Sequence, residues 1–142
     1  MSDEERDRFL TEQRTCRAAT VTAAGRPHVS PLWFVWDGSS VWLYSVVRSQ
    51  RWKDLQADPR MAVVVDAGVE YVELHGVELS GTVEVVGPVP RTGAEDVPEL
   101  RQPEELFFAK YFGGQTAHDG RHAWLRLQPD RQFTFDMRKL GQ

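Results

Sequence analysis

The sequence predicts a mostly β (α+β) fold, with an antiparallel sheet of six to seven strands closed into a small barrel and two or three helices at its margins. Short β-rich runs recur along the chain, and turn residues separate them. Glycines interrupt a long alternation of apolar and polar residues, as in strands that bend when a barrel closes. Of the 142 residues, 41% are hydrophobic and 27% charged, so residues 1–142 are expected to form a single domain.

The N-terminal part of the chain predicts one helix and three strands. A charged segment that contains Phe9 and Leu10 predicts a short helix within residues 1–14. Three β-rich runs joined by turns predict a β-meander. Pro31 cannot donate a ladder hydrogen bond, so its part of the second strand is expected at a sheet edge or a bulge. The three runs span residues 18–22, 28–36 and 41–46.

A second helix and a buried strand are expected next. Ser49 is a good N-cap, and the helix is expected to run from it to Ala57, where Asp58 and Pro59 end it. The continuous apolar run at 61–66 predicts a strand that is buried on both faces.

The C-terminal half predicts further strands and one insertion. Alternation over residues 69–86 predicts strands, and Gly76 and Gly81 within it predict bulges. Residues 87–115 are expected to be an insertion of loop and helix, with the helix at 103–112. Two final strands are expected at 123–127 and 132–136.

Composition and motifs exclude several classes of protein. The net charge of −4 is unlike that of a general nucleic-acid binder. The single cysteine, Cys16, cannot form an intrachain disulfide and is expected to be a small buried hydrophobe. There is no signal-peptide core and no apolar run long enough to cross a bilayer, so we expect a cytoplasmic protein without membrane contact. Glycine-rich dinucleotide loops, Walker loops, nucleophile elbows and paired-cysteine metal motifs are also missing from the sequence.

One segment has the features of an anion site. Where the strand at 41–46 ends, a helix begins at Ser49, and its first amides have no partner within the helix. Cationic and hydroxyl side chains surround this point, and arginine can hold a phosphate through two parallel hydrogen bonds. They are Ser45, Arg48, Ser49, Arg51 and Lys53. The alternative interpretation is a solvated basic turn that balances nearby acids.

Aromatic and histidine residues supply further candidates. Four tryptophans flank the segment, and aromatic walls beside an anion site suit a planar phosphorylated cofactor, although each could simply be core packing. They are Trp33, Trp36, Trp42 and Trp52. His118 and His122 have the spacing of a helical metal pair, but Gly120 between them indicates a loop, so no metal site is predicted.

The order and spacing of several short motifs resemble the pyridoxamine 5′-phosphate oxidase-like split β-barrel family. Within that family the chain resembles the short flavin/deazaflavin oxidoreductases that use coenzyme F-420. The resemblance covers most of residues 9 to 137. The motifs are Gly25-Arg26-Pro27-His28-Val29-Ser30-Pro31, Tyr44-Ser45, Ser49-x-Arg51-x-x-x-Leu55-x-x-Asp58-Pro59-Arg60, and Val83-Glu84 after Gly81.

The resemblance implies a homodimer whose cofactor lies in a groove between the subunits. By this resemblance the strand backbone faces the cofactor ring system at Val29, Ser30, Pro31, Leu32 and Trp33, and the cofactor phosphate is held by Tyr44, Ser45, Ser49, Arg51 and Lys53. Gln50 stands where pyridoxamine phosphate oxidases carry an arginine, and their C-terminal substrate-phosphate motif is missing. These two differences argue against the oxidation of pyridoxamine phosphate as the reaction of this protein.

The favoured hypothesis is an oxidoreductase that transfers hydride from reduced coenzyme F-420 to a small conjugated or heteroaromatic substrate, with FMN as the alternative cofactor. His28 and Tyr44 are the candidate proton donors. The other hypotheses are a non-catalytic flavin or deazaflavin carrier, a haem-binding protein with His28 or His75 as axial ligand, and a dimeric scaffold without a ligand.

Overall fold

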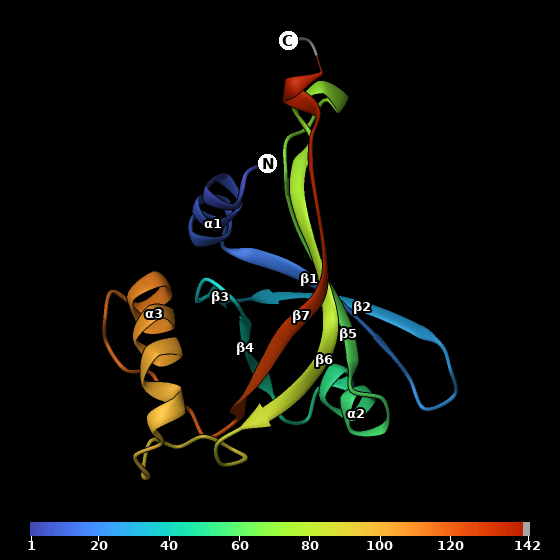
Figure 1. The fold of residues 1–142 in the computed structure, drawn as a ribbon. Coiled ribbons are helices and arrows are strands. Elements are labelled where there is room, and N and C mark those ends of the chain that lie inside the picture. The colour runs from blue at the N-terminus through green and yellow to red at the C-terminus, as the bar shows by residue number, and fades with distance from the viewer. Residues whose placement is uncertain (141–142) are drawn as a thin grey trace.

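The computed structural model describes residues 1–140, which form a curled antiparallel sheet with three α-helices around it (Figure 1). This mostly β, α+β architecture confirms the predicted fold class. In chain order the elements are α1 (Asp3–Glu12), β1 (Thr15–Val21), β2 (Pro27–Trp33), β3 (Val35–Trp36), β4 (Val41–Val46), α2 (Gln50–Ala57), β5 (Arg60–Ala67), β6 (His75–Val86), α3 (Arg101–Phe112) and β7 (His122–Asp136). Short 3-10 turns lie at Tyr71–Glu73, Pro98–Leu100 and Met137–Lys139.

Within residues 1–140 the strands form one seven-stranded sheet in the order β2-β1-β5-β6-β7-β4-β3. The sheet curls so that β2, at one edge, contacts β4 near the other edge without pairing to it. The long β6 and β7 form the spine of the molecule, with α1 and α3 on one side of it and α2 on the other in Figure 1. This arrangement is a split β-barrel.

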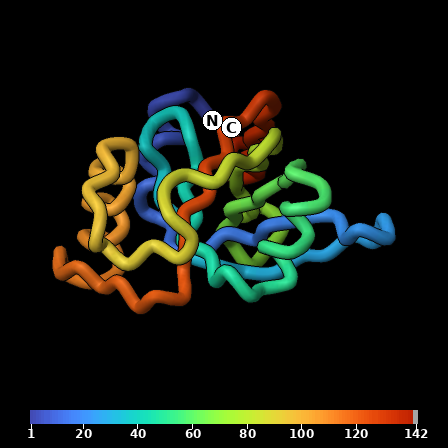
Figure 2. The backbone as a smooth tube through the Cα atoms, turned by 90° about the horizontal axis from the view of Figure 1, so that it is seen from below, coloured from blue at the N-terminus to red at the C-terminus, as the bar shows by residue number. Residues whose placement is uncertain are grey.

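Two apolar clusters form the core. The larger one fills the barrel and includes the buried side chains of Leu43, Val63 and Leu125. Cys16 belongs to it, as expected, and burial raises the pKa of its thiol to about 12. The second cluster lies beneath α3, where Phe107 and other aromatic rings pack on the outer face of β4 and β7. Figure 2 shows α3 at one end of the molecule and the β1–β2 hairpin at the other.

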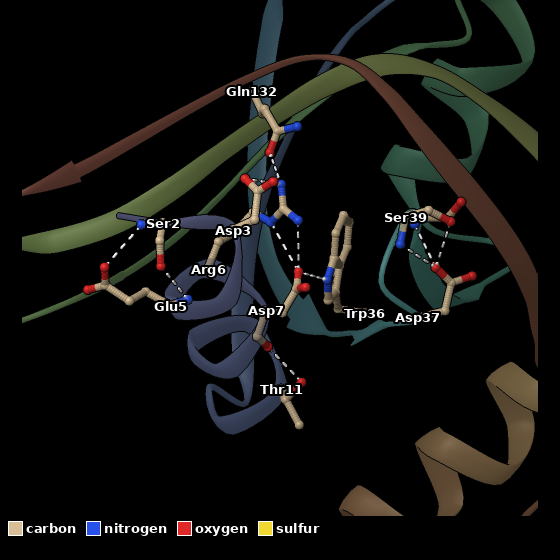
Figure 3. Close-up of polar contacts among 11 residues, drawn as sticks. Ser2, Asp3, Glu5, Arg6, Asp7, Thr11, Trp36, Asp37, Ser39 and Gln132 are labelled. Carbon is tan, nitrogen blue, oxygen red and sulfur yellow. Dashed lines mark hydrogen bonds and ion pairs between the residues drawn. The ribbon is translucent and has the colours of Figure 1, made fainter.

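The helix α1 is held to the sheet by polar contacts that Figure 3 shows. Ser2 and Glu5 form a capping box at its N-terminus. Asp7 accepts a hydrogen bond from Nε1 of Trp36 at 2.9 Å, and Arg6 donates to both Asp7 and Gln132. No helix in the described part of the chain has the length and apolarity that a membrane span requires.

The predicted β-meander is wrong beyond its first hairpin. β1 and β2 pair as expected, and Pro31 lies in an edge strand, but β4 pairs with β7 and with the two-residue β3. The reason is a break at Phe34, whose backbone bonds to side chains of α3 and not to a strand. Its N–H donates to Tyr111 Oη at 3.2 Å, and its carbonyl oxygen accepts from Lys110 Nζ at 3.2 Å.

Gly81 lies at a β-bulge, as predicted, whereas Gly76 does not. The β6–β7 register shifts between Ser80 and Gly81, where a Cβ on Gly81 would lie 2.7 Å from the carbonyl oxygen of Gln128. Gly76 pairs regularly with Phe135, and its missing side chain instead permits close approach to the carbonyl oxygen of Val65.

Three other expectations need correction. Residues 69–74 precede β6 as a turn, so the alternation there is not a strand. The final two strands are one continuous strand, β7, because Pro129 lies opposite the Gly81 bulge and does not interrupt the pairing. In β5 only one face is buried: Met61 and Val63 point into the barrel, while Ala62 lies exposed on the outer face.

Candidate functional site

A pocket of about 450 Å³ lies between the end of β2, the end of β4, α3 and the segment that leads into β7. The pocket combines the cation of Arg51, walls of apolar and aromatic side chains, and the neighbouring His122 and Asp119. Its lining residues are Pro31, Leu32, Trp33, Tyr44, Val46, Arg51, Phe107, Phe112, Ala117, Asp119 and His122. Such a mixture of apolar walls and a few polar groups is typical of a small-molecule site.

Arg51 is a buried cation that has no anionic partner among residues 1–140. Only 8% of the residue is exposed. Its Nη1 donates to Ser30 Oγ at 2.7 Å, and its Nε has no hydrogen-bond partner. No ion pair among residues 1–140 includes Arg51, and burial lowers the pKa of its guanidinium. An unpaired buried charge is costly, so this position is suited to an anion supplied from outside the chain.

Local sequence holds Arg51 in this position. Ser49 caps α2 by accepting the amide of Trp52 at 3.1 Å, which places Arg51 in the first turn. One turn later the buried Asp54 binds α2 to the β1–β2 hairpin: it accepts from Thr20 Oγ1 at 2.7 Å and lies 3.3 Å from His28 Nδ1. The predicted helix and its N-cap are therefore confirmed.

The aromatic wall of the pocket joins β2 to α3. The ring of Trp33 is 43% exposed and stacks on Tyr111, with centroids 4.3 Å apart and an interplanar angle of 8°. Phe107 and Phe112 approach the same indole at 6.3 and 6.0 Å. These rings give the pocket a flat, rigid apolar surface.

The polar end of the pocket is built around Tyr44. Its ring lies between His122, at 4.7 Å and 19°, and Trp124, at 4.6 Å. Its hydroxyl group lies 3.3 Å from Nδ1 of His118. Burial, together with the charges of Asp119 and Glu104, raises the pKa of Tyr44 to about 12.

The structure brings five of the eleven predicted site residues into this pocket. Pro31, Leu32, Trp33, Tyr44 and Arg51 line it together. The others lie elsewhere in the single chain. Ser30 accepts a hydrogen bond from Arg51, and Ser49 caps α2. Ser45 is buried, and its Oγ has no hydrogen-bond partner among residues 1–140, whereas Lys53 is exposed. Val29 lines a second groove, and His28, which does not line the pocket, faces Asp54.

Sequence reasoning missed the residues that the far end of the chain supplies. Phe107 and Phe112 come from α3, and Asp119 and His122 come from the segment just before β7 and its first residue. A local signal existed for the last two, because an aspartate three residues before a histidine in a loop can bind the ring nitrogen. Nδ1 of His122 lies 2.7 Å from Asp119 Oδ2.

A second, larger groove of about 710 Å³ lies on the outer face of the sheet, where β1, β2, β5, β6 and β7 contribute side chains. Val29 is 64% exposed and Phe133 60% exposed, and Ala62 and Val64 lie between them on this face. Polar and charged residues, among them Arg17, Glu78 and Arg131, also line this groove, and its Val29 belongs to β2, whose C-terminal end lines the pocket.

Solved structures with the same fold include proteins of several kinds. A conserved hypothetical protein from Mycobacterium tuberculosis is 29% identical, with a TM-score of 0.82, and the match covers 100% of this chain and 89% of that one. HutZ, the haem storage protein from Vibrio cholerae, is 18% identical with a TM-score of 0.72 and 92% of each chain covered. An F420 reductase is 22% identical with a TM-score of 0.67, covering 89% of this chain and 94% of that one.

Sequence comparison assigns the family. No curated protein sequence matches the chain. The family description of pyridoxamine 5′-phosphate oxidase matches residues 2–135, which is nearly the whole chain and includes every residue of the pocket. The chain therefore belongs to the pyridoxamine 5′-phosphate oxidase-like family of split β-barrel proteins.

Proposed function

We propose that this protein is an oxidoreductase that binds a phosphorylated, flavin-type cofactor in the pocket beside Arg51. Coenzyme F-420 is the favoured cofactor and FMN the alternative. The proposed reaction is hydride transfer to a small conjugated or heteroaromatic molecule. An F420 reductase and a FAD-binding protein from Mesorhizobium loti share the fold, which supports testing these cofactors first.

The observation that carries the proposal is the unpaired buried guanidinium of Arg51. A cofactor phosphate would supply the missing negative charge and accept hydrogen bonds from the guanidinium. The first amides of α2 are close in sequence, and their positive dipole end favours the same anion. The residues present therefore fit the phosphate of a flavin or deazaflavin.

The remainder of the pocket fits a planar ring system. Trp33 and the phenylalanines of α3 offer an apolar surface, while Pro31 and Leu32 contribute the edge-strand backbone. When bound, the cofactor supplies the hydride chemistry. The chain's own residues would bind its phosphate, orient its ring and exclude water from the reacting atoms.

A homodimer is part of the proposal. The outer groove exposes Val29 and Phe133 on a face that one chain leaves uncovered. Exposed apolar side chains with polar residues around them, here including Arg17, Glu78 and Arg131, mark interaction surfaces. A second copy seated on this face would cover it and close the open side of the pocket at β2.

The test is a fluorescence titration of the purified protein with F-420 and, separately, with FMN. Arg51→Ala should weaken binding of the phosphorylated cofactor by roughly 10- to 100-fold, the effect of losing a hydrogen bond to a charged group. Arg8→Ala removes the same charge from an exposed position of α1 that does not line the pocket, and should change the affinity less than about twofold.

Three results would contradict the proposal in different ways. If neither cofactor binds, the proposed function is wrong, and a haem titration is the next experiment. Binding that Arg51→Ala leaves unchanged would remove the assigned phosphate site. Tight binding without turnover of any acceptor would indicate a cofactor carrier.

A further inference from the structure

The polar end of the pocket holds a histidine–carboxylate pair with the geometry of a proton donor. Nδ1 of His122 lies 2.7 Å from Oδ2 and 2.9 Å from Oδ1 of Asp119, and both residues line the pocket. Burial acts against ionisation of Asp119, but hydrogen bonds from His122 and from the Arg121 amide outweigh it and lower the pKa of this carboxyl. A carboxylate that accepts a hydrogen bond from Nδ1–H orients the ring and leaves Nε2 free to contact a bound molecule.

Independent contacts hold the His122 ring in place. His122 is the first residue of β7 and pairs with Val46 of β4. Its carbonyl oxygen accepts the amide of Arg91 at 2.8 Å, and its ring stacks on Tyr44. None of the hydrogen bonds found in residues 1–140 uses Nε2 of His122. The imidazole is therefore oriented on one side and available on the other.

The two proton donors expected from the sequence have less suitable positions. His28 does not line the pocket, and its Nδ1 faces the buried Asp54. Tyr44 does line the pocket, but its hydroxyl group is engaged by His118, and its raised pKa makes the phenol a weaker acid. Geometry favours His122 over both.

We infer that His122 is the catalytic proton donor of this site and that Asp119 is its positioning residue. This inference rests on the proposed function. The substrate gains a hydride, with both electrons, from the reduced flavin or deazaflavin at one atom of a conjugated double bond. The other atom of that bond takes the proton from Nε2–H of the His122 imidazolium, whose Nδ1–H stays on Asp119, as the π bond breaks. The cofactor is oxidised, and the neutral imidazole recovers its proton from water.

The first test needs no turnover and no variant. Diethyl pyrocarbonate acylates accessible imidazole nitrogens, and mass spectrometry gives the rate at each histidine. Saturation with F-420 or FMN, whichever binds, should slow the reaction of His122 by roughly tenfold, because bound ligands cover most of a pocket's lining. His75 is the internal control: it lies outside the pocket, with Nδ1 2.7 Å from the carbonyl oxygen of Glu73, and its rate should not change.

The outcomes separate this inference from the proposed function. If the fluorescence titration shows no binding of either cofactor, the proposed function fails and the inference fails with it. If cofactor binds and His122 reacts as fast as before, only the assignment of His122 is overturned.

The second test measures catalysis with reduced cofactor and a panel of quinone, enone and nitroaromatic acceptors. His122→Gln should keep the cofactor Kd within about twofold and lower kcat by about 100-fold, with partial recovery on addition of free imidazole. Asp119→Asn should lower kcat by about tenfold, because a neutral amide stabilises the donating imidazolium less than the carboxylate does and orients the ring less firmly. An unchanged kcat in His122→Gln, or no turnover of any acceptor by the loaded protein, contradicts the inference.

Discussion

Arg51 and Asp54 lie three residues apart on the buried side of α2, yet the fold satisfies them very differently. Asp54 accepts hydrogen bonds from Thr20 at 2.7 Å and from Gln50 at 2.7 Å, and it also faces His28. Arg51 has a single hydroxyl partner and one nitrogen with none. The complete set of hydrogen bonds at Asp54 is typical of a residue with a structural role. The incomplete set at Arg51 is expected of a residue that binds a ligand.

Removing the Arg51 charge should stabilise the ligand-free protein while it weakens anion binding. Arg51→Met keeps much of the side-chain volume and removes the cost of burying a cation without an anion. We expect the free energy of unfolding to rise by about 1 kcal/mol. Urea denaturation without cofactor measures this. A destabilised Arg51→Met variant would show that Arg51 has a structural role.

Asp54 should make stability depend on acid pH. Burial raises the pKa of its carboxyl, but hydrogen bonds from Thr20, Gln50 and His28 outweigh this, so the folded-state pKa lies below the ordinary value. The contribution is therefore complete above the unfolded-state pKa of about 4 and is lost as the pH falls through the folded-state pKa. Urea denaturation should show a large difference between Asp54→Asn and the unmodified protein at neutral pH and a smaller one below about pH 4. An equal difference at both would contradict this.

For α2, the sequence predicted the N-cap Ser49 and the nearby cation Arg51, because both follow from local sequence signals. It did not separate Arg51 from Lys53. The helical period does so in the structure: Arg51 shares the buried side with Trp52 and Leu55, while Lys53 points to solvent. The spacing of Trp52 and Leu55 already indicated which side of the helix is buried.

Among the secondary-structure elements, α3 changes the architecture most relative to the sequence prediction. It supplies one wall of the pocket, and its Tyr111 and Lys110 bond to the backbone at Phe34, where the second strand breaks. Gly113 correctly predicted where this helix ends, since a glycine C-cap is a local signal, whereas the start predicted at Pro103 is two residues later than the observed start at Arg101. The break at Phe34 was not predictable, because its cause lies more than 70 residues away in the chain.

Tyr111→Phe should measure the contribution of the Tyr111 hydroxyl, which joins α3 to the backbone of Phe34 and Arg14. The phenyl ring can still stack on Trp33, but the Phe34 amide loses its partner, so the free energy of unfolding should fall by about 1–2 kcal/mol. Tyr71→Phe is the matched control because Tyr71 is 66% exposed, and it should have little effect. Equal effects of the two substitutions in urea denaturation would exclude the assigned role of Tyr111.

For the whole molecule, the informative error is the strand at 61–66. Its continuous apolar run predicted burial on both faces, whereas the single chain buries one and leaves Ala62 and Val64 on the outer groove. A second subunit on that groove would bury the other face. The sequence pattern would then be correct for the assembly, although it is wrong for the isolated chain.

The dimer is expected to depend on this groove. Val29→Glu places a charge on the β2 side of the groove and should convert the protein to a monomer in analytical ultracentrifugation, with weaker cofactor binding as a consequence. Val69→Glu is the control: Val69 is 88% exposed and lies outside the groove, so that variant should remain dimeric. A dimer that survives Val29→Glu would place the interface on another face.

The central claim, that Arg51 binds a cofactor phosphate, is tested most directly by a double cycle. Affinities are measured for the unmodified protein and for Arg51→Ala. Each is tested with a phosphorylated cofactor and its dephosphorylated form, which are FMN and riboflavin, or F-420 and the deazaflavin without its phosphate. We expect a loss of roughly 10- to 100-fold for the phosphorylated form and little or none for the dephosphorylated form, because the arginine effect requires the phosphate. An equal loss for both forms would show that Arg51 shapes the pocket without binding the phosphate.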